Sequence, residues 1–321
     1  MTVKIHEINH IGILGAGLMG HGIAQVFAQA GYKVSIFDAD AAVLGKAKER
    51  IAANFDVFIQ LKLASPAERE RCLELVTVSN DLQMLCDGPQ VIIEAISEDM
   101  ALKRKTYSAM EKYTPADTIL TSNTSALSIT DISAALEHKT RFLGTHFWNP
   151  PHIIPCVEVI MGDSTAEEVF NTVYLLMEKV GKVPVRVLKD IPGFLGNRLQ
   201  HALWREAISL QENKIASAED IDKVVKYGFG IRMPFIGPLE TADLAGLALT
   251  RDIHKYLFPY LESSSKPSPV LDTLVAEGAT GVKAGQGFYS WTPEKIQQVI
   301  RRRDTVLLKI INEIIGGVQG G

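Results

Sequence analysis

Short apolar runs alternate with longer segments of helical period from Ile11 to about Gly181. A strand of a parallel sheet reads as a continuous apolar run, because helices cover both of its faces. The alternation therefore predicts an α/β domain in which a parallel sheet lies between two layers of helices. The runs that we expect to form strands are Ile11–Leu14, Lys33–Phe37, Val91–Ala95, Thr118–Thr121, Phe142–Phe147 and Val157–Ile160.

The alternation is interrupted once and ends after Asp190. The interruption, Ala41–Leu63, is long, charged and helical in period, which predicts a helical arm that carries part of a substrate site. Beyond residue 190 most of the chain to Tyr260 has helical spacing, and the tail 293–315 is strongly amphipathic. We predict an α/β domain over residues 1–190 and an all-helical domain over residues 191–321.

The composition agrees with a two-domain globular protein and argues against a nucleic-acid-binding protein. A chain of 321 residues suits two domains, and 46% hydrophobic with 22% charged residues is ordinary for a soluble globular protein. The net charge of -4 combines both signs along the chain, so we expect no nucleic-acid partner.

The cysteines and the N-terminus bear on the compartment. Cys72, Cys86 and Cys156 match no metal-ligand spacing, so we expect no metal site and predict reduced, mostly buried thiols. The N-terminus lacks the pattern of a secretory signal, and no stretch approaches the ~18 apolar residues that span a bilayer. We therefore expect a cytoplasmic protein that is not embedded in a membrane.

The first apolar run leads into Gly15-x-Gly17-x-x-Gly20 and then into a helix. In a Rossmann dinucleotide-binding turn the first glycine allows a tight bend, the second lets the pyrophosphate approach, and the third permits close packing. Asp38 ends the next run, eighteen residues after Gly20. A carboxylate there binds the ribose hydroxyls and repels a 2′-phosphate, which predicts NAD over NADP. FAD uses the same turn, and a plain strand–turn–helix is the simplest alternative.

A candidate base follows at the end of a later run. Oxidation of an alcohol needs a group that accepts the hydroxyl proton, and His146 ends an apolar run where open sheets bind ligands. Glu158 lies in the next run, where an unpaired charge is costly, so a His–Glu pair would satisfy both groups. Ser125, in the polar loop Ser122–Ser125, could donate to the substrate oxygen. The alternatives are a structural histidine, an outward-facing glutamate and a loop that caps the helix 128–136.

Several segments, taken together, resemble the L-3-hydroxyacyl-CoA dehydrogenase family. The similarity runs over nearly the whole chain, and the order of the segments is more specific than any one of them. They are Gly15–Gly20 with His21–Gln25, Ser122–Ser125, His146–Pro150, Pro192–Arg198, Gly237–Leu247 and Gly281–Tyr289.

The resemblance implies roles for individual residues. His146 would be the base, Glu158 its partner, and Ser125 and Asn197 would hydrogen-bond the substrate oxygen. Without the resemblance, Asn197 would be taken as a helix-start amide and Lys103 as a solvated helix charge. The residues that we expect to bind the cofactor NAD are Gly15, Gly17, Leu18, Met19, Gly20, Asp38, Glu94, Lys103 and Asn123, with Glu94 and Lys103 near its nicotinamide half.

The resemblance also implies an architecture and an activity. The fold would be a Rossmann domain with a helical arm, followed by an all-α domain that forms a homodimer. The activity would be NAD-dependent oxidation of L-3-hydroxyacyl-CoA to 3-ketoacyl-CoA, a step of fatty acid metabolism. Relatives that use CoA esters carry several lysines in the arm, whereas Asn54–Lys62 has only Lys62 and adds Asp56. The alternatives are a free 3-hydroxy acid, as in gulonate and carnitine dehydrogenases, and a non-catalytic crystallin-like NAD-binding protein.

Overall fold

A computed structural model of the chain describes residues 3–318. Its internal contacts divide the chain into one unit over Met1–Arg198 and a second over Leu199–Gly321. The first unit is α/β and the second is helical, which confirms the predicted fold class. The domain boundary after residue 190 stays a prediction.

The first unit is built on a sheet with the strand order β3-β2-β1-β4-β5-β6-β7-β8. All neighbouring strands are parallel except β6 and β7, which pair antiparallel. The strands are β1 His10–Leu14, β2 Lys33–Phe37, β3 Val76–Ser79, β4 Val91–Glu94, β5 Ile119–Ser122, β6 Phe142–Phe147, β7 Cys156–Ile160 and β8 Val183–Val187.

Each of the apolar runs forms a strand as predicted, but one direction was wrong. The run Val157–Ile160 was expected to be parallel to its neighbours, and in β7 it runs antiparallel to β6. The reason is the short connection 148–155, because a parallel pair needs a crossover of about a dozen residues or more. The strands β3 and β8 were not predicted, since at the two edges of the sheet they are partly exposed and lack a continuous apolar run.

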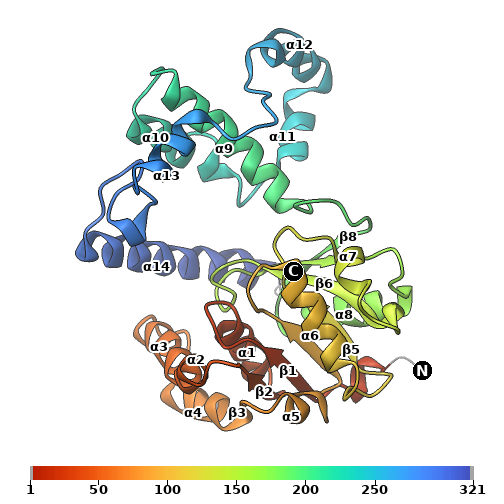
Figure 1. Cartoon of the computed structure of the whole chain (residues 1–321). Coiled ribbons are helices and arrows are strands. Elements are labelled where there is room, and N and C mark those ends of the chain that lie inside the picture. Colours follow the sequence, from red (N-terminus) through yellow and green to blue (C-terminus); the bar gives the residue numbers. More distant parts are fainter. Residues whose placement is uncertain (1–2, 319–321) are drawn as a thin grey trace. The chain divides into compact units, whose positions relative to one another are not determined.

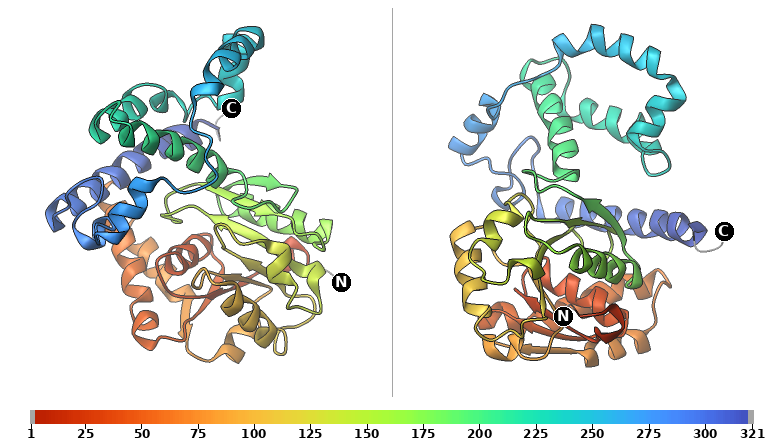
Figure 2. Two further views of the ribbon diagram at one scale, coloured as in Figure 1. Left: turned by 45° about the horizontal axis from the view of Figure 1, so that its top comes forward. Right: turned by 90° about the vertical axis from the view of Figure 1, so that its right-hand side faces the viewer.

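Helices cover both faces of this sheet (Figures 1 and 2). One apolar core joins the sheet to α1 Gly20–Gln29, α8 Glu167–Lys179 and the arm. A second core, on the other face, joins it to α5 Leu82–Cys86, α6 Met100–Met110 and α7 Ile129–Ser133. Because strand side chains alternate in direction, Ile93 belongs to the first core and its neighbour Ile92 to the second.

The helical arm is present, although its form differs from the single segment expected. It is divided at Lys46 into α2 Ala41–Gly45 and α3 Ala47–Gln60, and α4 Pro66–Leu75 follows. Along α3 the buried side chains are Ala47, Ile51, Phe55 and Phe58, which fall on one face at helical spacing. This face joins the same core as α1, so the arm is packed against α1.

The second unit consists of helices joined by loops. The helices are α9 Gly196–Glu212, which begins in the first unit, α10 Ala218–Tyr227, α11 Pro238–Ala245, α12 Leu247–Leu257, α13 Pro269–Ala276 and α14 Pro293–Val318. Short 3₁₀ helices occur in the two units at Ile5–Glu7, Lys139–Arg141, Gly230–Arg232, Phe258–Tyr260 and Val282–Ala284. None of the described helices is both long and apolar enough to cross a lipid bilayer.

Candidate active site

His146 and Glu158 lie directly opposite each other in the antiparallel pair β6–β7. Their side chains meet with 2.7 Å between His146 Nδ1 and Glu158 Oε2, and both residues are buried, at 4% and 2% exposure. A carboxylate only accepts hydrogen bonds, so Nδ1 carries the proton in this bond. The remaining ring nitrogen, Nε2, then has a lone pair that can accept a proton.

The second oxygen of Glu158 is held by the backbone at the start of α9. Oε1 accepts hydrogen bonds from the N–H groups of Leu195 at 2.9 Å and Gly196 at 3.0 Å. Burial raises the pKa of Glu158, but the bonds from His146 and these two N–H groups outweigh it, and the pKa falls below its ordinary value. The carboxylate is therefore charged at neutral pH and fixes the orientation of the imidazole.

Ser125 and Asn197, predicted to hold the substrate oxygen, are brought together. Asn197 Nδ2 donates to the backbone oxygen of Ser125 at 2.7 Å, so one amide proton of Asn197 is used within the protein. Asn123, in the same loop, accepts from the N–H of Phe147 at 2.8 Å. The loop is thereby tied both to the start of α9 and to the residue that follows His146. The helix α7 is capped by Ser128, so the Ser122–Ser125 loop is not needed as its cap.

Glu98 organises this loop and was not predicted from the sequence. Its Oε1 accepts from Thr124 Oγ1 at 2.6 Å, from the N–H of Ser125 at 2.9 Å and from that of Ala126 at 3.1 Å. Burial raises the pKa of Glu98, but these bonds and the charge of Lys103 together lower it by more, so the pKa falls below its ordinary value. The one feature of the sequence that could have pointed to Glu98 is its position after a predicted strand, between Glu94 and Lys103.

Glu94 and Lys103 form a buried ion pair beneath the strand ends. Lys103 Nζ lies 2.6 Å from Glu94 Oε1, and both side chains are at most 1% exposed. The other oxygen of Glu94 accepts from Ser122 Oγ at 2.6 Å and from Tyr107 Oη at 3.3 Å. The alternative of a solvated Lys103 is therefore wrong. Their predicted place near the nicotinamide stays a prediction.

The glycine turn between β1 and α1 fits a bound dinucleotide. A Cβ on Gly20 would lie 1.7 Å from the backbone oxygen of Gly15, so only glycine packs there. A Cβ on Gly17 would meet no atom within 4 Å, which leaves open space beside the N-terminus of α1. Asp38 accepts from the N–H of Ala16 at 2.8 Å, which holds its carboxylate beside the turn.

Comparison with known proteins identifies the family. A family model described as "3-hydroxyacyl-CoA dehydrogenase, NAD binding domain" matches residues 10–191, and one described as "3-hydroxyacyl-CoA dehydrogenase, C-terminal domain" matches residues 193–291. The chain belongs to the 3-hydroxyacyl-CoA dehydrogenase family. It is therefore an NAD-dependent oxidoreductase, and the NAD predicted from the glycine turn is confirmed as the cofactor.

Family members similar to this dehydrogenase have different named substrates. The 5-formyl-3-hydroxy-2-methylpyridine 4-carboxylate 5-dehydrogenase of Mesorhizobium japonicum is 33% identical over 95% of this chain and 99% of its own. The human mitochondrial hydroxyacyl-coenzyme A dehydrogenase is 36% identical over 88% of this chain and 91% of its own.

Solved structures similar to this chain also include enzymes with different named substrates. The crystal structure of a pyridine-carboxylate 5-dehydrogenase with the same substrate, described as an NAD+-dependent dismutase, has a TM-score of 0.90 at 31% identity and covers 96% of this chain and 99% of its own. That of (S)-3-hydroxybutyryl-CoA dehydrogenase from Ralstonia eutropha has a TM-score of 0.74 at 32% identity and covers 89% of this chain and 99% of its own.

The lowered pKa of Glu158 predicts a pH dependence of stability. Because the carboxyl group binds its proton less tightly in the folded state, its contribution is present above its ordinary pKa of 4.5 and is lost as the pH falls through the folded value. The free energy of unfolding of wild type minus that of Glu158→Gln should therefore decrease below pH 4.5. Urea denaturation between pH 3 and pH 7, chosen to bracket that value, measures it. A difference that does not change with pH would show that the carboxylate is not stabilised by its partners.

Proposed function

We propose that this dehydrogenase oxidises the 3-hydroxyl group of an acyl substrate, with His146 as the general base. The observation that carries the proposal is the buried hydrogen bond between His146 Nδ1 and Glu158 Oε2. It leaves Nε2 as the proton acceptor and gives the imidazolium a charged partner once the proton has moved. Glu158 is itself held by the N–H groups at the start of α9, so the imidazole is held in a fixed orientation.

The other predicted residues position the reacting oxygen. Ser125 Oγ and the second amide proton of Asn197 are the donors that we assign to the substrate oxygen as it becomes a carbonyl. NAD, held at the glycine turn, would supply the acceptor for the hydride on the carbon that carries the hydroxyl group. In the direction of reduction, His146 returns its proton to the oxygen.

The first candidate substrate is an L-3-hydroxyacyl-CoA, because both domains match the family models named for that activity. The second is a free hydroxy acid or another compact carboxylate, and the arm favours it. Asp56 pairs with Arg69 at 3.0 Å, while Phe55 and Phe58 are buried. The exposed Lys62 is the one basic residue in the segment 54–62. The fold of the pyridine-carboxylate dehydrogenase is also more similar to that of this chain, with a TM-score of 0.90 against 0.74 for the 3-hydroxybutyryl-CoA dehydrogenase.

A substrate panel separates these candidates. Turnover by the purified enzyme is followed through the change in NADH absorbance. Acetoacetyl-CoA is the substrate for reduction, and free 3-hydroxy acids and hydroxymethyl-pyridine carboxylates are the substrates for oxidation. A CoA-ester enzyme should turn over acetoacetyl-CoA with a kcat/KM at least about 10³-fold above that for any free acid, because remote binding energy contributes to the rate. The reverse order would assign a compact carboxylate. Absence of turnover on the whole panel by protein that binds NADH would instead support a crystallin-like role.

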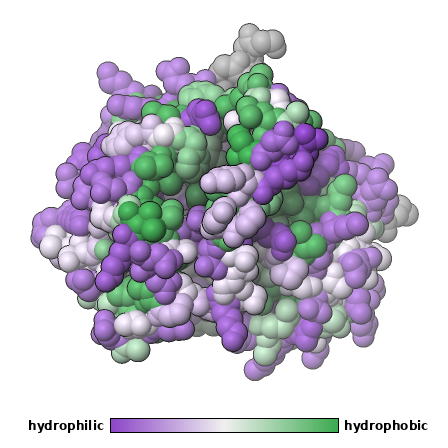
Figure 3. Space-filling model, turned by 90° about the horizontal axis from the view of Figure 1, so that it is seen from above, coloured by the Kyte–Doolittle hydropathy of each residue, from purple (hydrophilic) through white to green (hydrophobic). Residues whose placement is uncertain are grey.

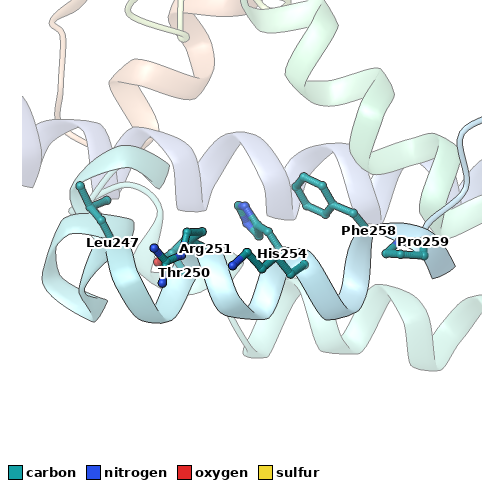
Figure 4. A pocket seen from close by; sticks show the side chains of 7 residues that line it. Leu247, Thr250, Arg251, His254, Phe258 and Pro259 are labelled. Atoms are coloured by element: carbon teal, nitrogen blue, oxygen red, sulfur yellow. The ribbon is translucent and has the colours of Figure 1, made fainter.

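We also propose that the enzyme is a cytoplasmic homodimer that associates through its second unit. Between Gly196 and Ala276, a region described in full, none of the helices has a buried residue. Tyr227 and Leu239 are 69% and 82% exposed, and apolar side chains gather on the face seen in Figure 3. Arg251, His254 and Phe258 line a hollow along one side of α12 (Figure 4). Apolar surface of this extent is typical of subunit interfaces.

The cysteines support the cytoplasmic part of the proposal. The free thiols of Cys72, Cys86 and Cys156 favour a reducing compartment.

A further inference from the structure

Arg50 connects the helical arm to the glycine turn. It lies on α3, and its Nη1 donates to the backbone oxygen of Ala16 at 3.0 Å. The next residue, Ile51, is fully buried in the core that α3 shares with α1. This packing fixes the rotation of α3 about its axis and therefore the side on which Arg50 lies. The guanidinium group is therefore held beside the turn, and the residue is half-buried.

The positive charge of Arg50 has no acidic partner in the part of the chain whose side chains are described. None of the ion pairs found there includes it, whereas Arg69 on the following helix α4 pairs with Asp56 and Glu70. Asp38 uses its carboxylate oxygens on the N–H groups of Ala16 and Asp40. A half-buried cation without an acidic partner is free to form an ion pair with an anion that binds beside it.

A second titratable group at the turn shows how close this charge lies. His21, which is 8% exposed, has its Nδ1 2.6 Å from the backbone oxygen of Gly17. Burial lowers the pKa of His21, its bond to Gly17 opposes this, and the charge of Arg50 lowers the pKa further. The guanidinium therefore acts on the same residues that surround the open space at Gly17.

We propose that Arg50 binds the diphosphate of NAD. The diphosphate of a dinucleotide lies at the second glycine and the N-terminus of the following helix, and here Gly17 has open space around it. Guanidinium has five N–H donors, and one is used on Ala16, so others can form charge-assisted bonds to phosphate oxygens. The arm then takes part in cofactor binding as well as in the substrate site expected of it.

Direct binding of NADH tests this assignment without turnover. The variants are Arg50→Gln, which removes the charge, and Arg50→Lys, which keeps it, with Arg69→Gln on α4 as a matched loss of charge away from the turn. Fluorescence titration should show that Arg50→Gln raises the Kd for NADH about tenfold, the effect of about one charge-assisted bond. Arg50→Lys should recover part of the loss, and Arg69→Gln should leave the Kd unchanged.

Two further ligands distinguish the diphosphate from other roles of Arg50. Adenosine lacks phosphate, so its inhibition constant against NADH should be the same for wild type and Arg50→Gln. A parallel loss of adenosine affinity would mean that Arg50 only braces the turn, and this would overturn the proposal. A loss of NADPH affinity much larger than that of NADH would place the guanidinium at the ribose 2′-position and would also overturn it. An unchanged Kd for NADH in Arg50→Gln would likewise overturn the proposal that Arg50 binds the diphosphate.

Discussion

Replacement of Gly17 with valine should weaken NADH binding by roughly 10²-fold or more while the protein stays folded. A Cβ at this position meets no atom beyond its chain neighbours within 4 Å, so a side chain can leave the backbone here into open space. In the binding mode that we propose, the diphosphate would approach the N–H groups of α1 through that space. Losing two charge-assisted hydrogen bonds would raise the Kd for NADH by roughly 10²-fold or more. Fluorescence titration measures the Kd, and circular dichroism with a thermal scan reports the fold.

Gly20→Ala is the matched control at the other end of the turn. Its Cβ would lie 1.7 Å from the backbone oxygen of Gly15, so this variant should lose thermal stability as well as NADH binding. If Gly17→Val proves unstable, Gly17→Ala makes the same test with a smaller group. NADH binding of wild-type strength by a folded Gly17 variant would show that the phosphates do not lie at this turn.

Much of the fold could be predicted because buried parallel strands and amphipathic helices have distinct periods. The failures occurred where that signal is weak. At the sheet edges, β3 and β8 are partly exposed, so neither has a continuous apolar run. The direction of β7 depends on the length of the connection 148–155 rather than on hydrophobicity.

The pairing of His146 with Glu158 could be predicted from chemistry, but its geometry could not. A histidine at a strand end and an acid in an apolar run each need a partner, which pointed to His146 and Glu158. What places them opposite each other is the antiparallel pairing that the sequence analysis missed. The N–H groups that hold Glu158 belong to the backbone of Leu195 and Gly196, and backbone donors have no sequence signature. Glu98 was missed because it stands among other acids before a helix and resembles an ordinary capping residue.

Replacement of His146 with glutamine tests the proton-transfer role, which is the central claim. The glutamine amide can still donate to Glu158, so the buried carboxylate keeps a donor and the sheet should stay folded. An amide cannot accept a proton at neutral pH, and removal of a general base lowers kcat by roughly 10²–10⁴-fold. His138→Gln is the control, because His138 is exposed and contacts Glu111 away from the site.

The decisive measurement is kcat for these two variants and for wild type, with the substrate that the panel identifies, alongside the Kd for NADH. We expect His146→Gln to lose at least about 10²-fold in kcat with little change in NADH affinity, while His138→Gln behaves as wild type. A folded His146→Gln enzyme whose kcat stays within a few-fold of wild type would contradict the assignment of His146 as the base.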